Sequence, residues 1–376
     1  MKTMNQIIII GAGILGASTA YQLAKSGAKV IVIDRMDKGQ ATDAAAGIVC
    51  PWLSQRRNKA WYALAKGGAK FYPNLISDLE KDGEQNTGYA RVGAISIHSD
   101  QKKLYEMKKR ALKRKEDAPE MGEITVLSEE QTKALFPPLA DGFGAVHVSG
   151  AARVDGRALR SSLIRGAAKH GANIINGHAD LVMDGNKVKG VIVNDQMIHS
   201  HSVIVTTGVW AKQLLEPIGL HFKVSSQKAQ IIHLQLTNME TKDWPVVMPP
   251  TDQYILSFDD HRIVIGATHE NNVGFDYRVT AGGIHEVLNK ALQIAPGLVD
   301  STILETRVGF RPFTPDFLPV FGPLPEHQGI LLANGLGASG LTMGPFIGAE
   351  LAKLALGLES DLNLSLYDVA GAIQSF

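Results

Sequence analysis

The sequence holds a single cysteine, Cys50, among 376 residues. One thiol excludes a disulfide within the chain, and it excludes zinc or iron–sulfur sites built from several cysteines. Net charge is nearly absent as well, because basic and acidic side chains sum to a formal +1. This balance gives no electrostatic reason to expect a nucleic-acid partner. No stretch of about 20 uninterrupted apolar residues occurs, so the sequence predicts no membrane span.

These absences are typical of an ordinary globular protein. The chain is long enough to bury a large core and to divide into two domains. A lone thiol fits a reducing cytoplasm, where we expect the protein, while peripheral association with a membrane and homo-oligomer formation stay open. Residues 1–20 imitate an export signal, because a lysine precedes an apolar run. Three glycines interrupt that run, and we therefore expect no signal peptide.

What the sequence does contain, near its start, is a strand–turn–helix–strand pattern. Four consecutive isoleucines, Ile7–Ile10, are typical of a strand buried on both faces. Gly11, Gly13 and Gly16 follow in the spacing G-x-G-x-x-G, and Asp34 ends the next strand, 18 residues after Gly16. Such glycines permit a tight turn, let the backbone come close to a pyrophosphate, and allow the helix to pack closely on the strand. The acid accepts hydrogen bonds from ribose hydroxyls. The pattern predicts a dinucleotide at a helix N-terminus without deciding which one.

The predicted secondary structure changes twice in the middle of the chain. Residues 145–220 return to alternating helix and strand patterns, whereas residues 221–270 favour short strands of an antiparallel sheet. We therefore expect an α/β fold with an α+β second part: a Rossmann-like dinucleotide domain with a mostly parallel sheet, and a substrate domain with a mixed or antiparallel sheet. The expected dinucleotide domain comprises residues 1–87, 145–220 and 300–376, and the expected substrate domain comprises residues 88–144 and 221–299.

A second glycine-rich turn lies near the other end of the chain. The strand pattern of Ile330–Ala333 leads into Asn334–Thr342, and a helical pattern follows. A turn of this kind presents a helix N-terminus to a ligand. Two such turns, far apart in the sequence, indicate one large cofactor held by both. Residues 305–316, just upstream, are punctuated by proline, and we expect irregular backbone there.

With these motifs the chain resembles, nearly end to end, the FAD-dependent D-amino acid oxidase/dehydrogenase family, which also contains glycine oxidase and sarcosine oxidase. Besides the first motif with Asp34, five further segments carry the resemblance: Ala44–Ile48, Thr207–Trp210, Val264–Thr268, Gly309–Asp316 and Gly335–Pro345.

The resemblance implies a bound FAD. It is expected to be non-covalent, because Gly309 stands where sarcosine oxidase-like members carry a flavin-linking cysteine. The pyrophosphate would lie against Gly11, Gly13, Ile14, Leu15 and Gly16. The adenosine ribose would meet Asp34 and Arg35, and a less secure backbone contact to adenine would fall near Asp180. The segment that runs under the phosphates and flavin would include Thr42, Ala46, Gly47 and Ile48. The turn that faces the flavin ring and ribityl chain would comprise Leu336, Gly337, Ala338, Ser339, Gly340, Leu341 and Thr342.

Two residues are implied for the substrate. Arg311 matches the family arginine that clamps a substrate carboxylate, a role that suits a planar, permanently charged guanidinium. A purely structural arginine, as Arg307 could be, is the alternative. Tyr254 matches a position whose hydroxyl assists carboxylate binding, although a strand tyrosine also packs in sheets. Ala338 stands where glycine oxidase has a further arginine, which puts glycine itself in doubt as the substrate.

The implied reaction is the oxidative deamination of a small amino acid, a D-amino acid or an N-substituted glycine. The flavin N5 takes a hydride from the α-carbon, and the electrons pass on to oxygen or a quinone-linked carrier. We name no catalytic acid or base, because the cofactor carries the chemistry. We also expect no metal, since His199 and His201 lack a third ligand. Two alternatives are an NAD-dependent dehydrogenase and a non-catalytic FAD-binding subunit of a larger dehydrogenase.

Overall fold

The strand β1 (Ile7–Ile10) lies inside a six-stranded sheet, in a computed structural model that describes residues 6–374. The sheet has the order β20-β21-β12-β1-β2-β8, and each pair is parallel except β20 with β21. The mostly parallel sheet that the sequence predicts is therefore confirmed. Its other strands are β2 (Val30–Asp34), β8 (Asn173–Asn176), β12 (Ser202–Val205), β20 (Val320–Pro323) and β21 (Ile330–Asn334).

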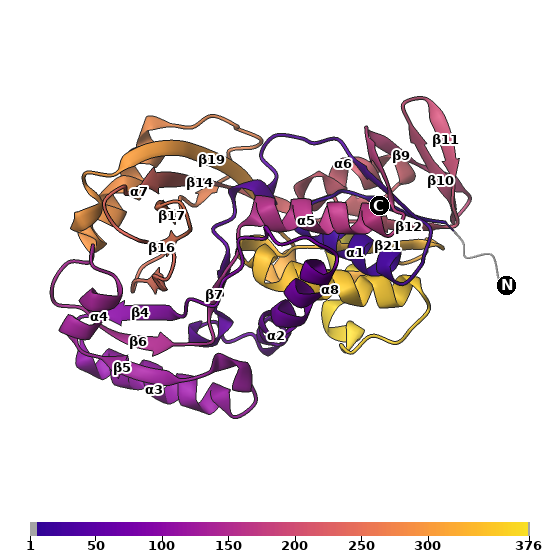
Figure 1. Cartoon of the computed structure of the whole chain (residues 1–376). Coiled ribbons are helices and arrows are strands. Elements are labelled where there is room, and N and C mark those ends of the chain that lie inside the picture. Colours follow the sequence, from indigo (N-terminus) through magenta and orange to yellow (C-terminus); the bar gives the residue numbers. More distant parts are fainter. Residues whose placement is uncertain (1–5, 375–376) are drawn as a thin grey trace.

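Both faces of this sheet are covered, as the run of four isoleucines predicts. Ile7 and Ile9 belong to a core that also holds side chains of helices α1, α2, α5 and α8, whereas Ile8 and Ile10 belong to a second core on the opposite face. In Figure 1 three of these helices, α1, α5 and α8, lie close together beside the sheet. The helices are α1 (Ile14–Lys25), α2 (Lys59–Lys81), α5 (Gly156–Lys169) and α8 (Gly340–Ala355).

The opposite face is covered by a helix and a small antiparallel sheet. This sheet has the order β11-β10-β9, and its apolar side chains share a core with Ile8 and Ile10. This sheet lies within residues 145–220, where the sequence predicts alternating helices and strands. The elements are β9 (Ala179–Asp184), β10 (Lys187–Val193), β11 (Gln196–His199) and α6 (Ala211–Leu215).

A nine-stranded mixed sheet forms the other half of the molecule (Figure 1). Its order is β18-β14-β17-β16-β15-β4-β6-β5, and β19 adds to β14. Only β15 and β4 pair in parallel among the strands of this sheet, so the predicted mixed or antiparallel sheet is confirmed. The strands are β4 (Ala94–His98), β5 (Ile124–Leu127), β6 (Gly144–Val148), β14 (Ser225–Gln235), β15 (Val246–Met248), β16 (Tyr254–Ser257), β17 (Arg262–Gly266), β18 (Glu270–Asn271) and β19 (Thr302–Phe313).

The expectation of irregular backbone at residues 305–316 is wrong, because most of that segment belongs to β19. Phe310 donates its backbone N–H to Gly39 on the side away from β14. Pro312 lies two residues further, so its nitrogen faces the same outer edge, and its missing N–H costs the ladder with β14 nothing. The domain boundaries stay a prediction, and β19 pairs with β14 across the boundary expected at residue 300.

The remaining elements are short or lie at the periphery. Three helices flank the nine-stranded sheet, and α7 packs on β14 and β17 through Val287 and Ala291. No helix within residues 6–374 is both long and apolar enough to cross a bilayer. The helices are α3 (Gln101–Lys115), α4 (Glu129–Leu135) and α7 (Ala281–Ile294), and two small ladders join β3 (Ile48–Val49) to β7 (Ala152–Arg153) and β13 (His221–Phe222) to β22 (Ile373–Gln374).

Candidate active site

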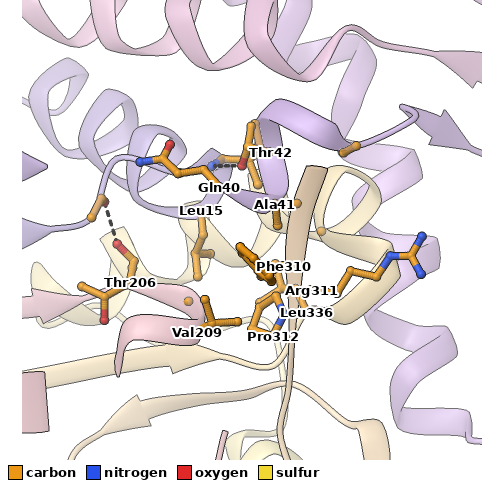
Figure 2. Close-up of a pocket in the computed structure, with 18 of the residues that line it drawn as sticks. Leu15, Gln40, Ala41, Thr42, Thr206, Val209, Phe310, Arg311, Pro312 and Leu336 are labelled. Carbon is orange, nitrogen blue, oxygen red and sulfur yellow. Dashed lines mark hydrogen bonds between the residues drawn. The ribbon is translucent and has the colours of Figure 1, made fainter. Parts of the chain in front are cut away.

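A long cavity is lined by residues of both sheets and of both ends of the chain (Figure 2). It brings together eighteen of the residues that the sequence singles out. Gly16, Asp180 and Ser339 are not among its lining residues. Those that line it are Gly11, Gly13, Ile14, Leu15, Asp34, Arg35, Thr42, Ala46, Gly47, Ile48, Tyr254, Arg311, Leu336, Gly337, Ala338, Gly340, Leu341 and Thr342.

The three glycines of the first turn serve different purposes. Gly11 has φ +99°, and a Cβ there would lie 2.7 Å from the carbonyl oxygen of Thr206. A Cβ on Gly16 would collide with the carbonyl oxygen of Gly11, so both glycines are required by the protein itself. Gly13 differs, since its Cβ would meet only the Thr42 hydroxyl at 3.5 Å. Gly13 therefore keeps cavity space clear for a ligand.

Two helix N-termini open onto the cavity. Gly13, Ile14 and Leu15 line it at the start of α1, and Gly340 lines it at the start of α8. The N-cap residues of the two helices, Gly13 and Ser339, make no side-chain capping bond. The Ile14 N–H donates to the Thr42 hydroxyl at 2.9 Å, a bond marked in Figure 2. Unpaired N–H groups and helix dipoles that converge on one cavity favour a negatively charged ligand such as a pyrophosphate.

Asp34 lies at one end of the cavity, at the carboxyl end of β2. Its carboxylate accepts hydrogen bonds from the backbone of Ala12 at 2.5 Å and of Met36 at 2.6 Å. These bonds aim the carboxylate across the glycine turn. Neighbouring Arg35 contacts His178, whose other ring nitrogen lies 3.2 Å from Asp180. His178, and not Asp180, lines the cavity at this end.

The segment between β2 and α2 follows the cavity wall. Gly47 has φ +97°, and a Cβ there would collide with the carbonyl oxygen of Val154. The Thr342 hydroxyl donates to the carbonyl oxygen of Ile48 at 2.8 Å, which ties the start of α8 to this segment. Gly309 lies opposite, and its Cβ would come within 2.7 Å of Ala44 Cβ. The residues packed against Gly309 therefore leave little room for a larger side chain at this position.

One buried hydroxyl in the wall marks a polar ligand. Thr207 Oγ1 is buried and makes no hydrogen bond within residues 6–374, although Thr207 lines the cavity. A buried polar atom without a partner is costly unless a ligand or water satisfies it. The open space at Gly13, the two helix N-termini and this hydroxyl together fit a dinucleotide cofactor. Thr207 belongs to a segment that carries the family resemblance, but the sequence does not reveal that its hydroxyl lacks a partner.

The substrate end of the cavity contains Arg311 and Tyr254. Arg311 donates a 2.9 Å hydrogen bond to Gln227, and its guanidinium also interacts with the Tyr254 hydroxyl. Burial raises the pKa of Tyr254 to about 12, while the nearby Arg311 works in the opposite direction. Burial also lowers the pKa of the Arg311 guanidinium, and Tyr254 and Asp252 oppose that change. The tyrosine is therefore a protonated hydrogen-bond donor at neutral pH.

Arg311 has no carboxylate partner of its own. No ion pair between Arg311 and an acidic side chain occurs in the part of the chain that the structure describes. Arg307, by contrast, forms an ion pair with Glu305 at 2.5 Å and donates to the carbonyl oxygen of Asp43. Arg307 is thus structural, whereas Arg311 presents a guanidinium to the cavity that a ligand carboxylate can bind.

Several lining residues were not anticipated from the sequence. His269 and Asp252 lie at the same end as Arg311, and Trp210 and Phe310 form part of an aromatic wall. Phe275 stacks on Trp210 and meets Phe310 edge-on. His269 directly follows the segment Val264–Thr268, but position alone does not reveal that its ring reaches the cavity. Among the described residues, no group of three or more His, Cys, Asp or Glu is placed to hold a metal.

Comparison with known proteins agrees with this site. The family model described as FAD dependent oxidoreductase matches residues 6–354. The chain is 65% identical to the Bacillus subtilis oxidoreductase YurR, over 98% of this chain and all of that protein. It is 30% identical to the glycine oxidase of Pseudomonas aeruginosa, covering 98% and 99% of the two chains. The structure of iminodiacetate oxidase (IdaA) from Chelativorans sp. BNC1 superposes with a TM-score of 0.93 at 46% identity, covering 96% and 98%.

The fold and the cavity thus define a flavin-dependent enzyme. The chain belongs to the family of FAD dependent oxidoreductases that includes the glycine oxidases. The resemblance drawn from the sequence motifs is therefore confirmed, and so are FAD as the cofactor and a C–N bond as the site of oxidation. An NAD-dependent dehydrogenase, the alternative suggested by the first motif, would leave the cavity-lining turn at Leu336–Thr342 without a ligand.

Proposed function

We propose that this enzyme oxidises a small amino acid whose carboxylate binds Arg311, and that the amino acid is an N-substituted glycine. The single observation that carries the proposal is the guanidinium of Arg311, which faces the cavity without an acidic partner beside the Tyr254 hydroxyl. The 46% identity to iminodiacetate oxidase supports an N-substituted glycine over a D-amino acid. Ala338, in the cavity wall, offers no second cation of the glycine oxidase kind.

The protein's part in the reaction is binding and orientation. FAD, when bound, supplies the chemistry by accepting two electrons and a hydrogen from the substrate α-carbon. Gly13 and the N-terminus of α1 would hold its phosphates, Asp34 its adenosine ribose, and the turn that leads into α8 its flavin and ribityl chain. Arg311 would bind the substrate carboxylate through two parallel hydrogen bonds, and Tyr254 would donate a third. Fixing the carboxylate fixes the position of the neighbouring carbon, whose hydrogen must face the flavin.

Loss of the α-hydride, together with the N–H proton that passes to solvent, leaves the C–N bond as an imine, and water hydrolyses this imine to an oxo acid and an amine. No acid or base from the protein is required for that step. We further propose that FAD is held without a covalent bond, because Gly309 supplies no nucleophile. Oxygen or a quinone-linked carrier would then reoxidise the flavin. The expected location is the cytoplasm, in keeping with the buried, unpaired Cys50.

The test uses the purified holoenzyme under anaerobic conditions. N-methylglycine, iminodiacetate, glycine and D-alanine are added one at a time while the visible flavin absorbance is followed. Bleaching by the N-substituted glycines ahead of D-alanine is the expected result. A flavin that stays oxidised with all of them would overturn the proposal and favour a non-catalytic FAD-binding subunit. Release of the yellow cofactor on acid precipitation tests the non-covalent attachment separately.

A further inference from the structure

Two ionisable side chains at the substrate end have no place in the function proposed above. Asp252 and His269 line the cavity together with Arg311. The His269 Nδ1 lies 3.5 Å from an Asp252 carboxylate oxygen. The other ring nitrogen, Nε2, makes no hydrogen bond to any residue between 6 and 374. His269 therefore has one nitrogen that faces Asp252 at 3.5 Å and one that can meet a ligand.

Building on the proposed function, we propose that His269 forms a second carboxylate subsite beside Arg311. The substrate class would then be an imino dicarboxylate, a glycine whose N-substituent itself ends in a carboxylate. Arg311 would bind the carboxylate next to the carbon that is oxidised. His269 would bind the distal carboxylate through its Nε2, while Asp252 would hold the opposite nitrogen in a fixed orientation, as carboxylates commonly do for histidine.

The balance of charge around His269 favours an anion over a cation. Asp252 is already engaged, since Lys290 lies 3.2 Å from one of its carboxylate oxygens and Gln253 donates to the same oxygen. Lys290 in turn pairs with Glu286 at 2.8 Å. The two acids thus share Lys290, and Arg311 is left as a cation that forms no ion pair with an acidic side chain within residues 6–374. An ammonium group on the substrate would find no unshared acid at this end.

The protonation of His269 should respond to the ligand. Burial and the positive charge of Arg311 lower its pKa, and Lys290 does so more weakly, while Asp252 and Glu286 act in the opposite direction. Without a ligand the ring is therefore mainly neutral at neutral pH. A dicarboxylate would neutralise Arg311 and place a further anion on Nε2, and both changes favour the charged imidazolium. Binding of a dicarboxylate should then be coupled to uptake of a proton, and a monocarboxylate should show this coupling less.

The second subsite is tested by the binding of two ethers that the enzyme cannot oxidise. Diglycolate has the shape of iminodiacetate and methoxyacetate that of N-methylglycine, with an ether oxygen in place of the nitrogen. Their affinities for the oxidised holoenzyme are measured between about pH 6 and 8, where a histidine titrates, by the perturbation of flavin absorbance. Diglycolate should bind more tightly than methoxyacetate, and its affinity should fall by up to ~10-fold per pH unit as the pH rises.

Variants of His269 separate its role from simple packing. In His269→Gln the preference for diglycolate over methoxyacetate should fall by roughly 10- to 100-fold, as expected for one charge-assisted hydrogen bond, and the pH slope should disappear. His269→Arg should restore the preference without the slope, because arginine does not titrate in this range. His285→Gln is the matched control, since His285 is exposed on α7 and does not line the cavity.

Failure of this inference is distinguishable from failure of the proposed function. If N-methylglycine bleaches the flavin but diglycolate binds no better than methoxyacetate, the second subsite is wrong and the proposed function stands. A diglycolate affinity that is independent of pH in the unmodified enzyme also overturns the role of His269, even if the variants do not fold. If no amine bleaches the flavin, the proposed function fails, while the two ethers still report on the subsite.

Discussion

Arg311 donates a 2.9 Å hydrogen bond to the side chain of Gln227, its directly paired neighbour across β14 and β19. Paired residues of neighbouring strands project from the same face of the sheet. The sheet register therefore holds the guanidinium in place at the cavity wall. Because Gln227 is neutral, the positive charge of Arg311 is left for a ligand. A glutamate in place of Gln227 would remove that property by forming an ion pair.

The first prediction concerns that charge. Arg311→Ala should retain FAD but lower kcat/KM for carboxylate substrates by ~100- to 1000-fold, since it removes about two charge-assisted hydrogen bonds of roughly 1.5–3 kcal/mol each, which do not add fully. The flavin spectrum and substrate titrations check both parts. Arg278→Ala is the matched control, because Arg278 is 82% exposed and pairs only with Asp276 among the described acids. Unchanged turnover in Arg311→Ala would remove Arg311 from the site.

The second prediction separates two glycines of one turn. Gly13→Ala should leave the stability of the apoenzyme nearly unchanged but weaken FAD, because the new methyl group would fill ligand space and touch only the Thr42 hydroxyl at 3.5 Å. Gly16→Ala should destabilise the apoenzyme by ~1–3 kcal/mol, since its methyl group would collide with backbone. Thermal unfolding without FAD and titration with FAD measure the two effects. Equal destabilisation of the apoenzyme by both substitutions would contradict this assignment.

The third prediction concerns the crowding at Gly309. Gly309→Ala should destabilise the protein, because its Cβ would lie 2.7 Å from Ala44 Cβ. Removing the opposing methyl group in Gly309→Ala/Ala44→Gly should recover part of the loss. We expect a coupling of ~0.5–2 kcal/mol, a range typical of residues in contact. Denaturant unfolding of both single variants and the double variant measures it, and additive effects would show that the two positions do not meet.

The fourth prediction concerns pH and stability. Burial, followed by the charges of Arg307 and Arg262, lowers the pKa of His233 to about 3 from its ordinary value of 6.5. The unfolded chain then binds a proton that the native protein does not, so this histidine makes the protein less stable as the pH falls from about 6.5 toward 3. His233→Gln should lose this contribution, whose slope is at most ~1.4 kcal/mol per pH unit.

The measurement for His233 is the difference between two proteins. Denaturant unfolding of the unmodified enzyme and of His233→Gln is compared at several pH values below neutrality. The stability of the unmodified enzyme relative to His233→Gln should fall as the pH falls, because only the unmodified enzyme carries the histidine penalty. His285→Gln, at an exposed position, should run parallel to the unmodified enzyme. Parallel curves for His233→Gln would mean that His233 is not held neutral in the native protein.

Much of the dinucleotide half could be predicted because its signals are local. The isoleucines of β1, the glycines after them and Asp34 follow one another along the chain, so spacing alone indicates the βαβ unit and its ligand. The turn at Leu336–Thr342 was found in the same way. In both segments the conformation of the backbone near the ligand depends on residues that are close in the sequence. Glycine at such a position indicates that a ligand or another backbone segment comes close.

The substrate half could be predicted only in outline. Alternating patterns indicate an antiparallel sheet, but they do not give the pairing of β14 with β19. That pairing decides that Pro312 faces an outer edge, and this is why a strand runs through a segment that looks irregular by composition. It also places Arg311 beside the neutral Gln227, whereas Arg307 is paired by Glu305 of its own strand.

By itself, then, the sequence determined a dinucleotide cofactor and the presence of two sheets, because both depend on short-range spacing, and the resemblance to the family supplied the candidate arginine. Only the tertiary structure brought His269 into the cavity that Tyr254, Arg311 and Asp34 line. The physical reason is that these residues come from separate segments, and sheet register sets which side chains project into a shared space. The charges of Asp252, Lys290 and Arg311 act on one another only after that register is formed.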